Sequence, residues 1–252
     1  MYVAFIIGTA GSGKSLLTAA FSEWLRGKEQ SVCIVNLDPG VTTLPYEPDV
    51  DVRDYIVIED IMRKYQLGPN GALIMAADLL AAEVDRIRGD IEDFRSDIVL
   101  VDTPGQMELF AFRSSGPHIA HGLTNDPRSV VYLFDAAFSS NPLNFVSNLF
   151  LAAAVFNRFL LPQVHVLSKV DLLSPKQIDA ILDWSEDEEY LRTAIETQLT
   201  PQKMLLSRGV LQAITDVGLT FGLIPVSAKE QSGLVDLYAE LTRIFTGGEE
   251  LI

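Results

Sequence analysis

A glycine-rich loop near the start of the chain constrains the fold more than any other feature of the sequence. Residues 8–15 read Gly-Thr-Ala-Gly-Ser-Gly-Lys-Ser and match G-x-x-x-x-G-K-[ST], directly after an apolar strand and directly before a helical pattern. In such a loop, backbone N–H groups turn inward around phosphate oxygens, and the helix N-terminus adds a favourable field. The sequence therefore predicts a strand–loop–helix unit that binds the phosphates of a nucleotide.

The last two residues of this loop have individual predicted roles. Lys14 would bridge the β- and γ-phosphates, which also makes it a candidate catalytic residue. The Ser15 hydroxyl stands where a Mg²⁺ ion bridging those phosphates needs an oxygen ligand. A nucleoside triphosphate with Mg²⁺ is the expected ligand. The predicted phosphate-binding set is Ala10, Gly11, Ser12, Gly13, Lys14 and Ser15.

Composition and charge exclude several other classes of protein. Apolar residues make up 48% and charged residues 21% of the 252 residues, which excludes global disorder. The net charge of −15 repels a phosphate backbone, so no direct nucleic-acid binding is expected.

A single cysteine, Cys33, excludes an internal disulfide and favours a reducing, cytoplasmic compartment. No apolar stretch reaches the roughly 18 residues that span a bilayer, so no membrane is expected.

Short apolar runs alternate with longer helical patterns, which predicts an α/β fold of the P-loop NTPase type, with a mostly parallel sheet flanked by helices. Six strands are expected, at residues 3–8, 31–37, 98–102, 129–134, 164–168 and 219–226. Helices are expected at residues 15–26, 52–65, 72–88, 141–159, 175–182, 186–199, 201–217 and 234–245. The length favours one domain over residues 1–252.

Three helical patterns follow one another within residues 174–218, where a simple alternating fold would carry one helix. We interpret this stretch as a helical insertion within the domain. It contains five acidic residues between positions 183 and 189. Such a run is typical of a solvated face or turn, and a surface that docks a partner is the alternative.

Two aspartates end apolar strands and would face the phosphate loop along one edge of the sheet. Asp102 precedes Thr-Pro-Gly-Gln, and a carboxylate there holds Mg²⁺, usually through water. Gly105 could offer its N–H to the γ-phosphate, so that loss of this phosphate would release the following loop. Asp38 could position the attacking water, support the water shell of the metal, or only cap the next turn. Gln106 and Glu108 are further candidates for orienting water, although polar loop residues are common.

A short motif after the fifth expected strand indicates which base is bound. Ser168, Lys169 and Asp171 fall in Ser-Lys-Val-Asp, which resembles the [NT]-K-x-D motif of GTPases. A carboxylate at Asp171 can accept hydrogen bonds from guanine N1 and N2, which adenine cannot supply, while the stem of Lys169 covers the base. Ser168 departs from the usual Asn or Thr. Its hydroxyl can bond nearby backbone, but we expect it to lose the amide link to the phosphate loop.

A second short motif follows the last expected strand and supports the same base. Ser227, Ala228 and Lys229 resemble the S-A-K motif, whose backbone N–H groups meet guanine O6. Each motif alone is weak, because loop-capping residues of this kind are common. Their order along the chain, after the phosphate loop and Asp102, favours guanine.

With these motifs in place, the chain resembles the GPN-loop GTPases, because Gly-Pro-Asn at residues 68–70 lies between the two acidic loops. The resemblance covers nearly the whole chain. It implies a homodimeric GTPase that takes GTP, GDP and Mg²⁺, in which loop 68–71 reaches into the partner's nucleotide site. Asn70 would then stabilise the phosphate in trans. The family's eukaryotic members look like assembly factors for RNA polymerase, so an unknown protein partner is expected by resemblance.

The helical pattern that begins at Ala72 is apolar around most of its circumference, which predicts either a fully buried core helix or a dimer contact. Two other functions stay open. A P-loop kinase would transfer phosphate to a small alcohol, but such kinases carry arginine-rich lids, and only Arg113 and Arg128 follow Asp102 in this region. A non-catalytic assembly scaffold would use the nucleotide only as a structural ligand.

Overall fold

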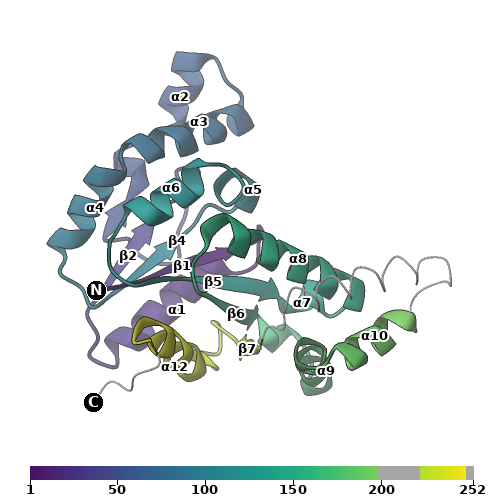
Figure 1. The fold of residues 1–252 in the computed structure, drawn as a ribbon. Coiled ribbons are helices and arrows are strands. Elements are labelled where there is room, and N and C mark those ends of the chain that lie inside the picture. Colours follow the sequence, from purple (N-terminus) through teal and green to yellow (C-terminus); the bar gives the residue numbers. More distant parts are fainter. Residues whose placement is uncertain (198–221, 248–252) are drawn as a thin grey trace.

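A parallel β-sheet organises the molecule, for which a computed structural model describes residues 1–197 and 222–247. Within these residues, seven strands pair in parallel in the order β3-β2-β4-β1-β5-β6-β7 (Figure 1). The strands are β1 (Tyr2–Gly8), β2 (Val32–Asn36), β3 (Val50–Asp51), β4 (Ile98–Asp102), β5 (Arg128–Asp135), β6 (Gln163–Ser168) and β7 (Leu223–Val226). The predicted α/β fold with a parallel sheet is confirmed, and the two-residue β3 adds a strand to the six expected.

Helices connect the strands and cover both faces of the sheet (Figure 1). The α-helices are α1 (Lys14–Arg26), α2 (Ile58–Tyr65), α3 (Pro69–Ala82), α4 (Val84–Asp93), α5 (Met107–Phe110), α6 (Ser115–Gly122), α7 (Ala136–Ser139), α8 (Pro142–Phe159), α9 (Pro175–Glu186), α10 (Glu188–Glu196) and α12 (Leu234–Phe245). Single 3₁₀ turns form η1 (Val52–Asp54) and η2 (Val170–Leu172). Helices α5, α6 and α7 were not predicted, because elements of one or two turns carry little periodicity.

Alternate side chains of the central strand β1 enter two separate apolar cores. Ala4 and Ile6 pack with Phe21 of α1 and with apolar residues of α12 on one face of the sheet. Phe5 and Ile7 belong to the larger core on the other face, which α3 to α6 and α8 cover. Burial on both faces explains why the strands are continuous apolar runs rather than alternating ones.

The pattern at residues 52–65 does not form one helix, so that prediction is wrong. The chain first completes β3, and the Asp51 carboxylate then accepts a hydrogen bond from Arg53 N to cap η1. Val57 has an extended backbone, and α2 begins only after it. Val52 of η1, Ile56 of the connecting segment and Ile61 of α2 all lie in the core despite this break.

The pattern at residues 72–88 forms two helices rather than one. Helix α3 begins earlier, at Pro69, because the fixed φ of proline suits the first helical turn. Glu83, with φ −95° and ψ 4°, ends α3 and precedes α4. This turn lets Val84 and Ile87 of α4 join the same core as Ala76 of α3.

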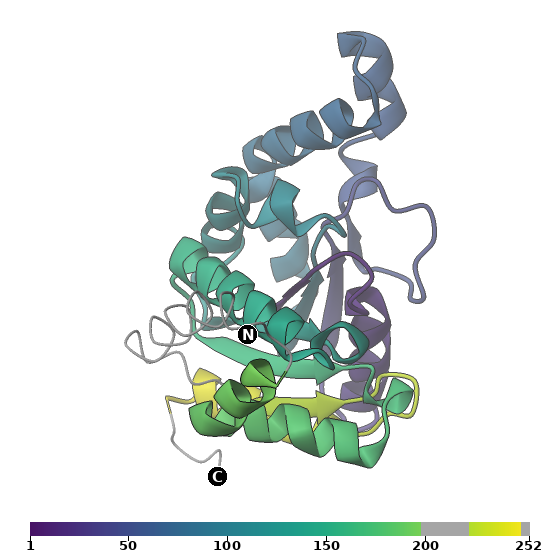
Figure 2. The ribbon, with the colours of Figure 1, turned by 90° about the vertical axis from the view of Figure 1, so that its right-hand side faces the viewer.

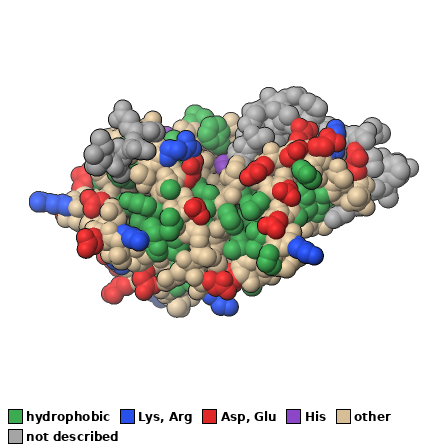
Figure 3. All heavy atoms as spheres, turned by 90° about the horizontal axis from the view of Figure 1, so that it is seen from below, with side chains coloured by type: hydrophobic (Ala, Val, Ile, Leu, Met, Phe, Trp, Pro, Cys, Tyr) green, Lys and Arg blue, Asp and Glu red, His purple; other side chains and the backbone are tan. Residues whose placement is uncertain are grey.

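Helices α9 and α10 follow β6 without a strand between them, as the sequence predicts for the start of the stretch 174–218. The helix expected at residues 201–217 lies outside the described residues. The acidic run of α9 and α10 is mostly exposed, and acidic side chains gather toward this end of the molecule in Figure 3. Among the helices that the structure describes, none is both long enough and apolar enough to cross a membrane.

Candidate nucleotide site

The predicted site residues follow the carboxyl ends of neighbouring strands, where parallel sheets bind their ligands. The phosphate loop leaves β1 and enters α1 at Lys14. Its Gly11 and Gly13 have φ of 75° and 95°, a left-handed conformation that glycine adopts without strain. Ser12 N donates to Thr9 O at 3.1 Å and closes the turn. The local backbone therefore has the shape that the motif predicts.

Lys14 lies under the loop, with 5% of its surface exposed. Its Nζ donates to Gly8 O at 2.9 Å and to Thr9 O at 3.0 Å. Burial lowers the pKa of this ammonium, and the nearby carboxylates of Asp102 and Asp38 act in the opposite direction. A bound phosphate would add further negative charge, which favours the charged form of Lys14.

Asp102 ends β4 beside β1 and is only 2% exposed. Its Oδ2 accepts a hydrogen bond from the Tyr46 hydroxyl at 2.7 Å, whereas its Oδ1 is buried without a hydrogen-bond partner among the residues the structure describes. Burial raises the pKa of this carboxyl, while the nearby Ser15 hydroxyl, the hydrogen bond from Tyr46 and the charge of Lys14 lower it. An oxygen that lacks a partner, beside a serine hydroxyl, fits the needs of a hard divalent cation.

Tyr46 is a site residue that the sequence did not reveal. It lies in the connection between β2 and β3, which swings wide of the sheet in Figure 2. Irregular connections carry no periodicity, and Tyr46 belongs to no recognised motif. Only the folded chain brings it to Asp102, which is 56 residues away in the sequence.

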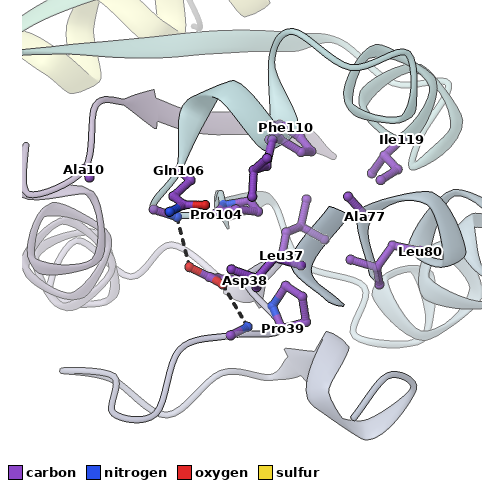
Figure 4. A pocket seen from close by; sticks show the side chains of 14 residues that line it. Ala10, Leu37, Asp38, Pro39, Ala77, Leu80, Pro104, Gln106, Phe110 and Ile119 are labelled. Carbon is purple, nitrogen blue, oxygen red and sulfur yellow. Dashed lines mark hydrogen bonds between the residues drawn. The ribbon is translucent and has the colours of Figure 1, made fainter. Parts of the chain in front are cut away.

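Asp38 joins the two acidic loops. Its Oδ1 accepts from Gly40 N and its Oδ2 from Gly105 N, both at 2.9 Å (Figure 4). The Asn36 side chain holds the backbone of this loop, since it accepts from Asp38 N and donates to the Asp51 carboxylate. The N–H predicted to meet the γ-phosphate is thus bonded to a carboxylate of the same chain.

The two remaining candidates for orienting water, Gln106 and Glu108, are exposed and lie on the segment after Gly105. Gln106 lines a cavity of about 220 Å³ together with Ala10 of the phosphate loop and Asp38 (Figure 4). Glu108 lies close enough to Lys14 for its charge to affect the pKa of the lysine. Apolar residues of α3, α5 and α6 line the cavity together with Leu37, Pro39 and Pro104, so the acidic loops and α3 share one cavity.

Ser168 is tied directly to the phosphate loop, contrary to expectation. Its hydroxyl lies 2.8 Å from Ser12 O and 3.1 Å from Phe134 O, and it donates its single proton to these carbonyls. The prediction that the loss of an asparagine amide removes this link is therefore wrong. A short side chain suffices here because Ser168 is buried directly beside the loop.

Lys169 makes a second link between the base loop and the phosphate loop. Its Nζ donates to Asp135 Oδ2 at 2.7 Å and also to Gly11 O. Asp135, which ends β5 and caps α7, was not predicted as a site residue. It extends the link to a third strand of the sheet.

The two predicted base-binding motifs meet in space. The Ser227 hydroxyl donates to Asp171 Oδ1 at 2.7 Å. Ser227 is fully buried, whereas Ala228 is half-buried and Lys229 is exposed. This hydrogen bond orients the carboxylate that was predicted to contact guanine.

Asn70 lies apart from these groups. It is exposed in the first turn of α3, and its side chain makes no hydrogen bond with any residue that the structure describes. Helix α2 and its connection to α3 project beyond the body of the molecule (Figures 1 and 2). The structure therefore does not bring Asn70 together with the phosphate loop of its own chain.

The fold and the loop geometry together define a P-loop NTPase, and comparisons with known proteins narrow the class. A family model described as "Conserved hypothetical ATP binding protein" matches residues 6–247. GPN-loop GTPase PAB0955 from Pyrococcus abyssi is 35% identical over 239 residues, which are 94% of each chain. Its crystal structure, described as a GTPase in apo form, matches with a TM-score of 0.85 and 33% identity over 97% of both chains.

A eukaryotic relative is also named a GPN-loop GTPase and matches this chain over a shorter span. GPN-loop GTPase 1 from Saccharomyces cerevisiae is 32% identical over 193 residues, which cover 75% of this chain and 49% of that protein. The chain thus matches about half the length of this relative. The chain belongs to the GPN-loop GTPase family.

Proposed function

We propose that this protein hydrolyses GTP to GDP and phosphate, with Mg²⁺, as a homodimer that completes its sites across the interface. The choice of base rests on one observation, the hydrogen bond from Ser227 to Asp171. It joins both base-binding loops and fixes the carboxylate that we expect to accept from guanine N1 and N2. The family model mentions ATP, whereas the relatives are named GTPases, and a carboxylate at this position favours guanine.

The phosphates would lie in the loop of residues 8–15, with the Lys14 ammonium against the β- and γ-phosphates. Ser15 and Asp102 would hold Mg²⁺, which, when bound, neutralises charge on the phosphate oxygens. The buried Oδ1 of Asp102 supports this assignment, because it has no hydrogen-bond partner among the described residues, and the Ser15 hydroxyl is near enough to this carboxyl to lower its pKa.

Among the candidates for orienting the attacking water, Asp38 is the best placed. Its Oδ2 accepts from Gly105 N, the donor that we expect to bind the γ-phosphate. A γ-phosphate that takes this donor would release one carboxylate oxygen at the point where water must attack. Gln106, at the rim of the same cavity, would be a second contact for that water.

Asn70 would act on the phosphate of the partner subunit. Its side chain is exposed and has no hydrogen-bond partner among the described residues. The helix behind it is not fully buried: Ala72 and Ala76 are inside, but Ile74 and Met75 are half-exposed. Apolar side chains left in this state support α3 as the dimer contact, one of the two predictions made for it.

Phosphate release with GTP or ATP, each with and without Mg²⁺, tests the proposal. GTP should be hydrolysed and ATP should not, and chelation of Mg²⁺ should abolish release because the phosphate charge is then unscreened. A preference for ATP would contradict the role of Asp171. Tight GTP binding without release would favour the scaffold, and phosphate transfer to an added alcohol faster than hydrolysis would favour the kinase.

A further inference from the structure

The Tyr46 hydroxyl donates a hydrogen bond to Asp102 Oδ2 at 2.7 Å. The other carboxylate oxygen, Oδ1, is buried without a hydrogen-bond partner in the described part of the chain. A buried carboxylate that ligates a cation directly or through water works best when a second group fixes its orientation. In this site, Tyr46 has the position of that second group.

We propose that Tyr46 is a positioning residue for the metal site: its hydroxyl holds Asp102 Oδ2 and leaves Oδ1 for the water shell of a divalent cation. This inference rests on the proposed Mg²⁺-dependent function. It assigns a role to the middle of the β2–β3 connection, beyond Asp38, which no predicted motif includes. Through Tyr46, the middle of that connection contacts the metal site directly.

The alternative is that Tyr46 only anchors its own loop. Other contacts already do this. Arg53 pairs with Asp51 and donates from Nη1 to Val41 O at 3.2 Å, which holds the start of the connection. The Asp49 carboxylate accepts from Ile34 N at 2.7 Å and holds its end. The Tyr46 hydroxyl bonds to none of these groups.

The ring and the hydroxyl of Tyr46 can be separated by mutation. The ring packs against the core that α1 and α12 cover, and the hydroxyl bonds to Asp102. Tyr46→Phe therefore keeps the packing and removes only the donor. Tyr55 offers a matched control, because its hydroxyl also donates to an aspartate, Asp90, on α4 outside the nucleotide site.

The experiment titrates Mn²⁺ into complexes of the full chain with GDP and measures free Mn²⁺ by electron paramagnetic resonance. We expect Tyr46→Phe to weaken Mn²⁺ binding about tenfold, as is typical when the partner of a metal ligand is lost. Affinity for GDP in excess chelator should stay at the wild-type value, because no metal is then involved. Tyr55→Phe should change neither quantity.

Three results would overturn the inference. Wild-type Mn²⁺ affinity in Tyr46→Phe would show that the hydroxyl does not serve the metal. An equal loss of Mn²⁺ affinity and of metal-free GDP affinity would show that Tyr46 only supports the loop. If the wild-type complex bound Mn²⁺ no better than GDP alone, the proposed metal dependence itself would fail, which the wild-type titration shows before any variant is compared. Thermal unfolding of each variant without ligand verifies the fold.

Discussion

Two regions of the molecule differ in how their functional side chains are held. The base-binding loops and the phosphate loop form one region, and the α2–α3 segment forms the other. The loops are tied to one another within the chain, by Ser168 to Ser12 and by Ser227 to Asp171. Asn70, at the start of α3, is exposed and makes no hydrogen bond with any described residue. Under the proposed function, the groups that bind the nucleotide are organised within one subunit, whereas Asn70, which we expect to act in turnover, is left exposed for another molecule.

Lys14→Ala should have the largest effect, because it removes the buried cation that lies under the phosphate loop. We expect phosphate release to fall by about 100-fold or more, the size typical for loss of a transition-state donor. Phosphate release at saturating GTP measures this. Lys28→Ala is the control, since this exposed lysine follows the far end of α1 and lies over the Trp24 ring, outside the site. A Lys14→Ala protein with normal turnover would contradict the assignment of the phosphate loop.

Asn70→Ala should separate turnover from nucleotide binding. Turnover should fall about 10-fold to 100-fold while GTP affinity stays near the wild-type value, because Asn70 would act only on the charge of the transition state. Single-turnover hydrolysis and GTP binding measure the two quantities. Asn157→Ala, an exposed asparagine on α8, should leave both unchanged.

Mixing the impaired Lys14→Ala and Asn70→Ala proteins sharpens this comparison. A mixed dimer contains one site with Lys14 intact and Asn70 supplied by the partner, so activity should return on mixing. Activity that stays at the level of the separate variants would show that Asn70 acts within its own chain or not at all.

Asp171→Asn tests how the base-binding loop recognises guanine. GTP affinity should fall about tenfold, because a charge-assisted hydrogen bond to the guanine N–H groups is lost. Xanthosine triphosphate should gain, since its 2-carbonyl can accept from the new amide. Competition between the two nucleotides measures the switch. Asp179→Asn, at an exposed position on α9, should keep the preference for GTP, and an unchanged preference in Asp171→Asn would remove guanine recognition from this loop.

Ser168→Ala should have the smallest effect. It leaves the Ser12 carbonyl without its buried donor, so the free energy of unfolding should drop by about 1 to 2 kcal/mol. Urea denaturation without nucleotide measures this change. Ser147→Ala removes a comparable hydroxyl that bonds Leu143 O on the exposed side of α8, and it should have almost no effect. Equal losses of unfolding free energy in the two variants would show that the link to Ser12 stabilises the fold no more than an exposed hydroxyl does.

The sequence predicted most of the sheet and the phosphate loop, because these depend on neighbouring residues. Gly11 and Gly13 permit the loop conformation, and unbroken apolar runs predict strands buried on both faces. The helix boundaries were less predictable. Glu83 separates α3 from α4 only because Val84 and Ile87 turn back into the core.

The contacts that complete the candidate site could not be read in this way. Tyr46 meets Asp102 across 56 residues, Asp38 meets Gly105 across 67, and Ser168 reaches Ser12 across 156. The sequence by itself determined which chemical groups follow the strands. The tertiary structure decided which of these groups touch, because parallel pairing brings distant strand ends to one edge and side-chain length then selects the partners.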